Sequence, residues 1–125
     1  MKVGLRYGKG EIDVAVDAAW VATVIGKPAM PVLDDPSRAV AEALANPVGA
    51  PPLATLARAA KSACILICDI TRPVPNGTVL PVLVRTLLDA GMAADAITVL
   101  VATGLHRPNE GEELRELVGD DWVLE

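Results

Sequence analysis

The stretch of sequence that decides the fold runs from residue 63 to residue 118. It reads ACILICDI (63–70), TRPVPNG (71–77), TVLPVLVRTLLDA (78–90), AITVLVA (96–102), TGLHRP (103–108) and NEGEELRELV (109–118). The two short apolar runs are typical of buried strands, and the segments with leucine at helical spacing are typical of helices. Strand, loop and helix repeating in this order predict a parallel sheet built from βαβ units. We therefore expect an α/β fold with a doubly wound, mostly parallel sheet and helices on both of its faces.

The two helices of this stretch carry their own boundary signals. The helix over residues 78–90 places its leucines on one face, and Pro81 should lie in its first turn, where a missing N–H is harmless. Asn109, with Glu112 three residues later, predicts a capping box at the start of the next helix, and Gly119 should end it.

On the N-terminal side of this stretch the sequence predicts a small β-rich subregion. Residues 2–6 and 12–16 are expected to pair as a hairpin around a glycine-rich turn, and residues 20–25 are a third candidate strand. Asp35 followed by Pro36 then predicts the capped start of a helix.

The remaining elements are a helix over residues 53–60 and a strand that begins at residues 122–125. A chain of 125 residues fits one domain, which we take as residues 1–125. Because the last expected strand is unfinished, the chain looks truncated at its C-terminal end.

Composition argues against several classes of function. The net charge of −5, the lack of a basic stripe and the 2% aromatic content make nucleic acid an unsuitable partner. No apolar run reaches the ~18 residues of a membrane span, and no signal peptide is evident, so we expect a cytoplasmic protein without a membrane partner. Cys64 and Cys68 are too far apart on one strand to form a disulfide and are interpreted as buried structural thiols.

Polar side chains gather in the two loops that follow the predicted strands. Asp69 and Arg72 follow the first strand, and His106 follows the second. Because ligands bind beyond the carboxyl ends of parallel strands, we expect both loops to open onto one crevice. Arg72 offers a planar fork for a carboxylate, and Asp69 either holds that fork or takes a hydroxyl proton. His106, the only histidine, suits proton transfer near neutral pH, so the set fits a small 2-hydroxy or 2-keto acid.

Several other polar residues receive lesser roles. Thr71, Thr103, Gly104 and Arg107 are expected to support the site without touching the reacting atoms. No metal ligands are assigned, because the glutamates of the last helix (Glu112, Glu113 and Glu116) are interpreted as a solvated face. Each main residue also has a structural interpretation: Asp69 can anchor a loop, Arg72 can cap a turn, and a single histidine can lie on the surface.

The loop sequences DITRP (69–73) and ATGLHRP (102–108) resemble the nickel-dependent lactate racemase family. ALANPVGAPPL (43–53) and LRYG (5–8) are similar to that family too, and the likeness covers essentially all 125 residues in order. The resemblance implies that the chain is the N-terminal α/β domain of a two-domain isomerase that racemises a 2-hydroxy acid in the cleft between its domains.

The resemblance also implies a cofactor and residue roles. The cofactor is a nickel pincer nucleotide, a pyridinium-derived mononucleotide attached to a lysine, which accepts a hydride from C2 of the substrate. Asp69 and Arg72 would orient the substrate, and His106 would be one of two acid–base histidines. The second histidine, the nickel-binding histidine and the lysine would lie beyond residue 125, in the missing C-terminal domain, so the 125 residues alone are expected to be inactive.

Two alternatives from other classes remain open at the level of sequence. The chain can be a free-standing α/β module that binds a small acid or phosphate through Arg72 and loop N–H groups, without catalysis. It can also be a purely structural domain. The identity of the 2-hydroxy acid and the oligomeric state are not specified by these residues.

Overall fold

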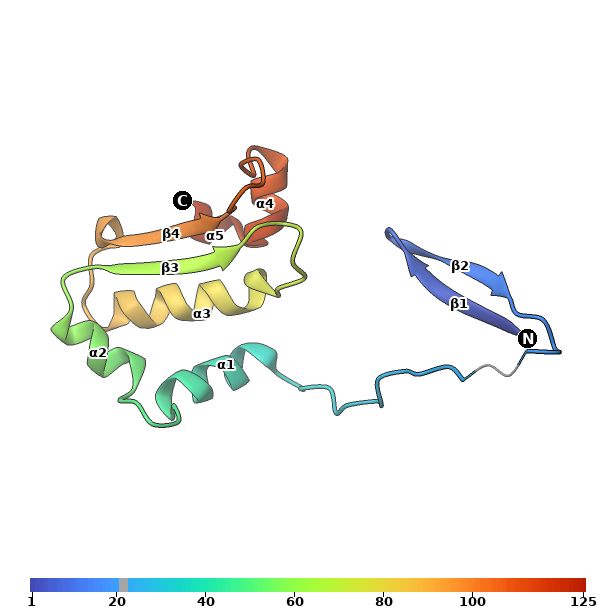
Figure 1. The fold of residues 1–125 in the computed structure, drawn as a ribbon. Coiled ribbons are helices and arrows are strands. Elements are labelled where there is room, and N and C mark those ends of the chain that lie inside the picture. The colour runs from blue at the N-terminus through green and yellow to red at the C-terminus, as the bar shows by residue number, and fades with distance from the viewer. Residues whose placement is uncertain (21–22) are drawn as a thin grey trace. The chain divides into compact units, whose positions relative to one another are not determined.

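The computed structural model describes residues 1–20 and 23–125, which divide into two compact units, Met1–Val32 and Leu33–Glu125 (Figure 1). The first unit is a hairpin of β1 (Lys2–Tyr7) and β2 (Gly10–Ala15), whose antiparallel register runs from Lys2 opposite Ala15 to Tyr7 opposite Gly10. The predicted hairpin is therefore present. Of the third predicted strand, residues 21 and 22 lie outside the described residues, and residues 20 and 23–25 are in neither a helix nor a strand.

The second unit begins with two helices, α1 (Pro36–Ala45) and α2 (Leu53–Ala59). The start of α1 is built as its sequence predicts: Pro36 is the first helical residue, and the Asp35 carboxylate accepts a hydrogen bond of 2.9 Å from the Arg38 backbone N–H. This bond satisfies one of the amides that a helix start leaves without a partner.

A parallel βαβ unit follows, and it carries the loops of interest. Strand β3 (Ala63–Cys68) leads to α3 (Asn76–Asp89), which returns through a 3₁₀ turn, η1 (Ala94–Ala96), to β4 (Ile97–Ala102). The two strands pair in parallel from Ala63 opposite Ile97 to Cys68 opposite Ala102. The predicted βαβ order is confirmed for this part of the chain.

The chain then forms two short helices, α4 (Glu112–Val118) and α5 (Asp121–Leu124). Gly119 ends α4 in the left-handed conformation, as expected. The strand predicted from residue 122 was wrong, because the Asp120 carboxylate caps a helical turn by accepting from the Val123 N–H at 3.2 Å. Trp122 lies with its ring 4.5 Å from the guanidinium of Arg85 on α3.

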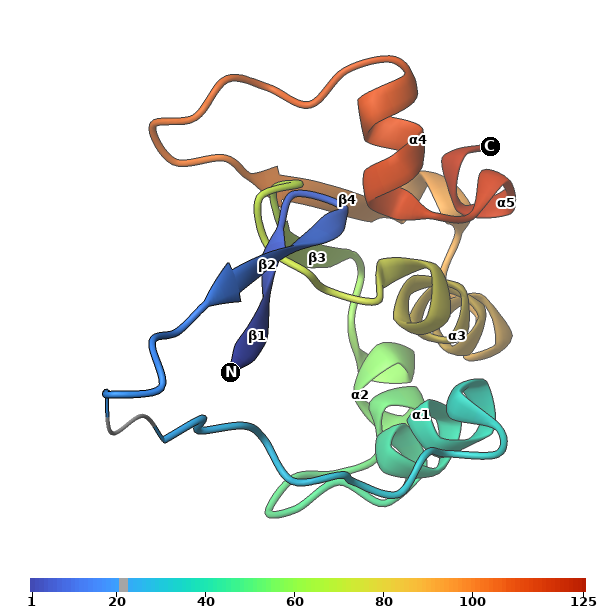
Figure 2. The same ribbon diagram turned by 90° about the vertical axis from the view of Figure 1, so that its right-hand side faces the viewer.

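The core lies between the β3–β4 sheet and the helices on one of its faces (Figures 1 and 2). Leu80 of α3 is 1% exposed and packs with Ile67 of β3 and with Leu117 and Val118 of α4. A second cluster joins Ala57, Leu87 and Met92.

The opposite face of the two-stranded sheet is open in the described residues. Burial alternates along both strands, so that every second side chain is exposed. The exposed side chains are those of Cys64, Leu66, Cys68, Thr98, Leu100 and Ala102. Helices on both faces, the doubly wound arrangement, are therefore not seen here. The prediction that Cys64 and Cys68 are buried was wrong for the same reason, since both point to the uncovered face and are free thiols.

Helix α3 begins earlier than the sequence suggests. It starts at Asn76, which places Pro81 in the second turn and not in the first. The early start is stabilised from α4: the buried Asn76 side chain donates a hydrogen bond of 2.9 Å to the Leu117 carbonyl. Gly77 lies against Gly119 so closely that an added Cβ atom would be 2.5 Å from the Gly119 carbonyl oxygen.

In the described residues, no helix has the length and apolar character that a membrane crossing requires.

Candidate active site

The two predicted site loops leave the same edge of the β3–β4 sheet. Cys68 and Ala102, the last residues of the two strands, are register partners, and both strands point in the same direction (Figure 1). Residues 69–75 then lead into α3, and residues 103–111 lead into α4. The parallel register therefore holds the starts of both loops side by side.

Asp69 and His106 are in direct contact across these loops. The Asp69 side chain is almost fully buried, whereas that of His106 is 53% exposed, and the Nδ1 atom of His106 is hydrogen bonded to Asp69 Oδ2. The second carboxylate oxygen, Oδ1, accepts from the Thr71 hydroxyl at 2.6 Å and from the Thr71 backbone N–H at 3.2 Å. Both oxygens of Asp69 are thus engaged by residues that the sequence assigned to the site.

Electrostatics keep Asp69 ionised at neutral pH. The hydrogen bond from the Thr71 hydroxyl and then the one from His106 lower the pKa of Asp69 below its ordinary value of 3.8, against the opposing effect of burial. An ionised carboxylate can only accept hydrogen bonds, so the Nδ1 atom of His106 carries the proton. In a neutral imidazole, Nε2 is then an unprotonated acceptor on the exposed side chain, as a general base requires.

Arg72 occupies the same loop as Asp69 but does not bind it through its side chain. Its backbone N–H donates to the Asp69 carbonyl at 3.1 Å, which shapes the turn after β3. The exposed guanidinium makes no hydrogen bond or ion pair with any residue that the structure describes. The prediction that Asp69 holds the Arg72 guanidinium is therefore not met, because Asp69 binds Thr71 and His106 instead. The guanidinium of Arg72 is left free for an anionic ligand.

The loop after β4 turns sharply to present His106. The His106 backbone N–H donates to the Thr103 carbonyl at 2.9 Å, and Gly104 between them has φ of +59°, a conformation that favours glycine. Thr103 is half-buried, and its backbone N–H donates a hydrogen bond of 3.1 Å to the Val101 carbonyl. Thr103 and Gly104 therefore shape the loop backbone.

A second polar network joins the two loops beside this pair. Arg107 donates two hydrogen bonds to the Glu113 carboxylate, at 2.6 and 2.8 Å, and Asn109 donates a third at 2.9 Å. The buried Asn109 also accepts from the Ile70 backbone N–H at 3.4 Å, in the loop of Asp69.

This network corrects two predictions. Asn109 does not cap α4, because the helix starts at Glu112 after Gly111, and no side chain caps it. Glu113 is not part of a solvated face, because its side chain is only 27% exposed and is bound by Arg107 and Asn109. The overlooked signal was the spacing of Asn109 and Glu113, four residues apart across a helix start.

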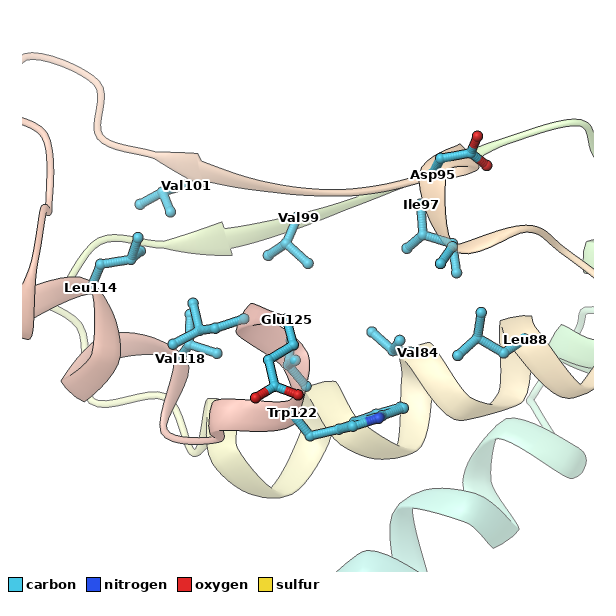
Figure 3. A pocket seen from close by; sticks show the side chains of 13 residues that line it. Val84, Leu88, Asp95, Ile97, Val99, Val101, Leu114, Val118, Trp122 and Glu125 are labelled. Carbon is cyan, nitrogen blue, oxygen red and sulfur yellow. The ribbon is translucent and has the colours of Figure 1, made fainter.

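The described residues also form an open pocket of about 670 Å³, and none of the residues that line it belongs to either loop (Figure 3). Most of its lining consists of aliphatic side chains, many of them from α3, β4 and α4. Trp122 is its aromatic side chain, and Asp95 and Glu125 contribute carboxylates. It offers no cation to a small acid, so it is not the candidate site.

Known proteins resemble this chain in sequence and in fold. The lactate racemase N-terminal domain family matches residues 7–125. The chain is 45% identical over 85 residues to a lactate racemase of Lactiplantibacillus plantarum and 37% identical over 84 residues to one of Thermoanaerobacterium thermosaccharolyticum. Each match covers 67% of this chain but 20% of the relative, so the chain spans only part of the length of these proteins.

A solved structure of the lactate racemase apoprotein from Thermoanaerobacterium thermosaccharolyticum has a similar fold. The TM-score is 0.76 at 27% sequence identity, and the match covers 98% of this chain and 28% of that one. The loops described above thus occur in a fold already observed in a lactate racemase. With the family match over nearly the whole chain, this places the protein in the lactate racemase family, as a chain corresponding to its N-terminal domain.

Proposed function

We propose that the chain is the substrate-orienting N-terminal part of a 2-hydroxy acid racemase or epimerase, an isomerase of the lactate racemase type. The observation that carries this proposal is the contact of His106 with the ionised, buried Asp69, at the same sheet edge as the free guanidinium of Arg72. A base, a group that orients it and a carboxylate-binding cation are the parts that proton removal from a 2-hydroxy acid requires.

In this proposal each residue has one task. The Arg72 fork binds the substrate carboxylate through two parallel hydrogen bonds. Asp69 fixes the tautomer of His106, so that Nε2 accepts the proton of the C2 hydroxyl. The imidazolium that forms is stabilised by the adjacent carboxylate, as in other histidine–aspartate pairs. Thr71 holds the carboxylate in place.

Racemisation by hydride transfer needs a proton acceptor for the C2 hydroxyl of each enantiomer, and this chain contains one histidine. The described residues include no group of three His, Cys, Asp or Glu side chains placed to hold a metal ion, so they do not fit a nickel site. We therefore assign the second acid–base group, the nickel pincer nucleotide and its role as hydride acceptor to the rest of the enzyme, outside this chain.

The test uses the full-length enzyme that contains this chain. His106→Ala should abolish interconversion of L- and D-lactate while the nickel content stays unchanged, because the imidazole is proposed to act on the substrate and not on the metal. Arg72→Ala should raise KM for lactate, whereas Arg38→Ala, the same change on α1, should not. Undiminished racemisation by the His106→Ala enzyme would overturn the proposed role.

The free guanidinium of Arg72 also suits a second candidate function, a small-acid or phosphate-binding module without catalysis. Titration calorimetry of the 125-residue chain with lactate and with phosphate separates the two. Tight, saturable binding by the chain alone favours the module. Binding only by the full-length enzyme favours the racemase, whose site requires both parts.

A further inference from the structure

His106 lies in the middle of an irregular loop, residues 103–111, whose other side chains are largely exposed. The side chain before it, Leu105, is fully exposed. A loop of this kind moves unless its backbone is tied to rigid elements, and a catalytic base must be held within a fraction of an ångström. Contacts outside the Asp69–His106 pair must therefore hold this loop against the loop of Asp69.

One carboxylate connects both sides. Glu113, in the first turn of α4, accepts two hydrogen bonds from Arg107, the residue directly after His106. The same carboxylate accepts from Asn109, whose side-chain oxygen binds the N–H of Ile70, the residue directly after Asp69. Glu113 is thus connected to both loops. Arg107 links it to the neighbour of His106, and Asn109 links it to the N–H of Ile70, the neighbour of Asp69.

We propose that Glu113 is a positioning residue, which fixes the His106 loop so that the imidazole stays on Asp69. This inference rests on the proposed function but concerns a residue that contacts neither member of the pair. The bidentate geometry restrains the direction of the Arg107 side chain as well as its distance. Asn109 is buried, so its two hydrogen bonds are little screened by water.

The charge state of Glu113 supports this role. Hydrogen bonds from Arg107 and then Asn109 hold the pKa of Glu113 below its ordinary value of 4.5, so it is ionised at neutral pH. Helix α4 does not depend on this carboxylate for its place. Leu117 and Val118 are buried in the core, and the Leu117 carbonyl is bound by Asn76. Loss of the Glu113 charge should loosen the loop and leave the helix in position.

The test compares Glu113→Gln with Glu112→Gln in the full-length enzyme. Both changes remove one negative charge from the same turn of α4. Glu112, however, is exposed and takes no part in the hydrogen bonds of Glu113 or in those of the Asp69–His106 pair. Glu113→Gln should lower kcat by about 10-fold or more with KM for lactate within about 2-fold, because a displaced catalytic group costs up to about 100-fold in rate. Glu112→Gln should keep the wild-type kcat. Equal kcat in both variants overturns the proposal.

A second measurement separates loop positioning from a general loss of stability. In Glu113→Gln, the amides of residues 103–111 should exchange with deuterium faster, while those of β4 keep their wild-type rates. Arg107→Gln removes the other half of the ion pair without touching α4 and should give the same pattern. Unchanged exchange of the loop, or faster exchange of β4 as well, contradicts a local role.

A double mutant identifies the route of the effect. If Glu113 acts through the Asp69–His106 pair, Glu113→Gln should lower kcat no further in an Asp69→Asn background. A full additional loss there overturns the inference while leaving the proposed function intact. Conversely, if His106→Ala keeps its activity, the proposed function fails, and the exchange data still report whether Glu113 anchors the loop.

Discussion

Gly77→Ala should destabilise the fold even though alanine is the better helix former. A Cβ atom at residue 77 would lie 2.5 Å from the carbonyl oxygen and 3.1 Å from the carbonyl carbon of Gly119. Both are backbone atoms, so α3 and α4 must separate, at a cost of about 1–3 kcal/mol for overpacking. The separation also strains the Asn76–Leu117 hydrogen bond, which adds about 1 kcal/mol. The gain from replacing glycine in a helix is at most about 1 kcal/mol, so the net loss is about 2 kcal/mol.

Urea unfolding of the chain, followed by circular dichroism, measures this loss. With a slope of about 2 kcal/mol per molar urea, the midpoint should fall by about 1 M. Gly26→Ala is the matched control, because a Cβ atom there meets no atom within 4 Å, and its midpoint should stay near wild type. A Gly77→Ala midpoint equal to or above that of Gly26→Ala would refute the close approach of the two helices.

Three further predictions concern the core and the candidate site. Leu80→Ala should destabilise the chain by about 2–5 kcal/mol in the same urea assay, because Leu80 is 1% exposed in the main cluster. Asp69→Asn should lower kcat of the full-length enzyme by about 10²–10⁴-fold in initial-rate assays, since the amide lacks the charge that stabilises the imidazolium. The lowered pKa of Asp69 stabilises the fold above its ordinary value of 3.8, and this contribution disappears as pH falls through the folded-state pKa. The stability difference between wild type and Asp69→Asn should therefore shrink as pH falls below about pH 4, as measured by urea midpoints between about pH 3 and about pH 5.

The regular elements followed from local sequence wherever a pattern was long enough. The order of β3, α3 and β4 was readable because Leu80 and Leu87 repeat at helical spacing between two apolar runs. Residues 122–125 were misassigned because their three apolar residues, 122–124, fit a strand as well as a helix, and the cap at Asp120 decides between them. Pro81 was placed one turn too early because the α3 start depends on Asn76 binding α4, a contact distant in sequence.

The sequence predicted where the candidate site lies but not which of its side chains are hydrogen bonded to one another. Two polar loops after parallel strands indicate a shared edge, and the structure brings Asp69 and His106 together there. Sequence did not show that Asp69 binds the imidazole and leaves Arg72 free, because that choice depends on how each loop turns after its strand. Nor did it find the Glu113 network, whose members span three separate elements of the fold. The burial of Cys64 and Cys68 was misjudged because alternation along a strand does not tell which face is covered.

A crystal structure of the full-length enzyme with bound lactate tests most directly whether the two loops form one half of a single site. We predict one lactate whose carboxylate is held by the Arg72 guanidinium and whose C2 hydroxyl is within hydrogen-bond distance of His106 Nε2. A lactate bound in the cleft and contacted by neither side chain would contradict the account.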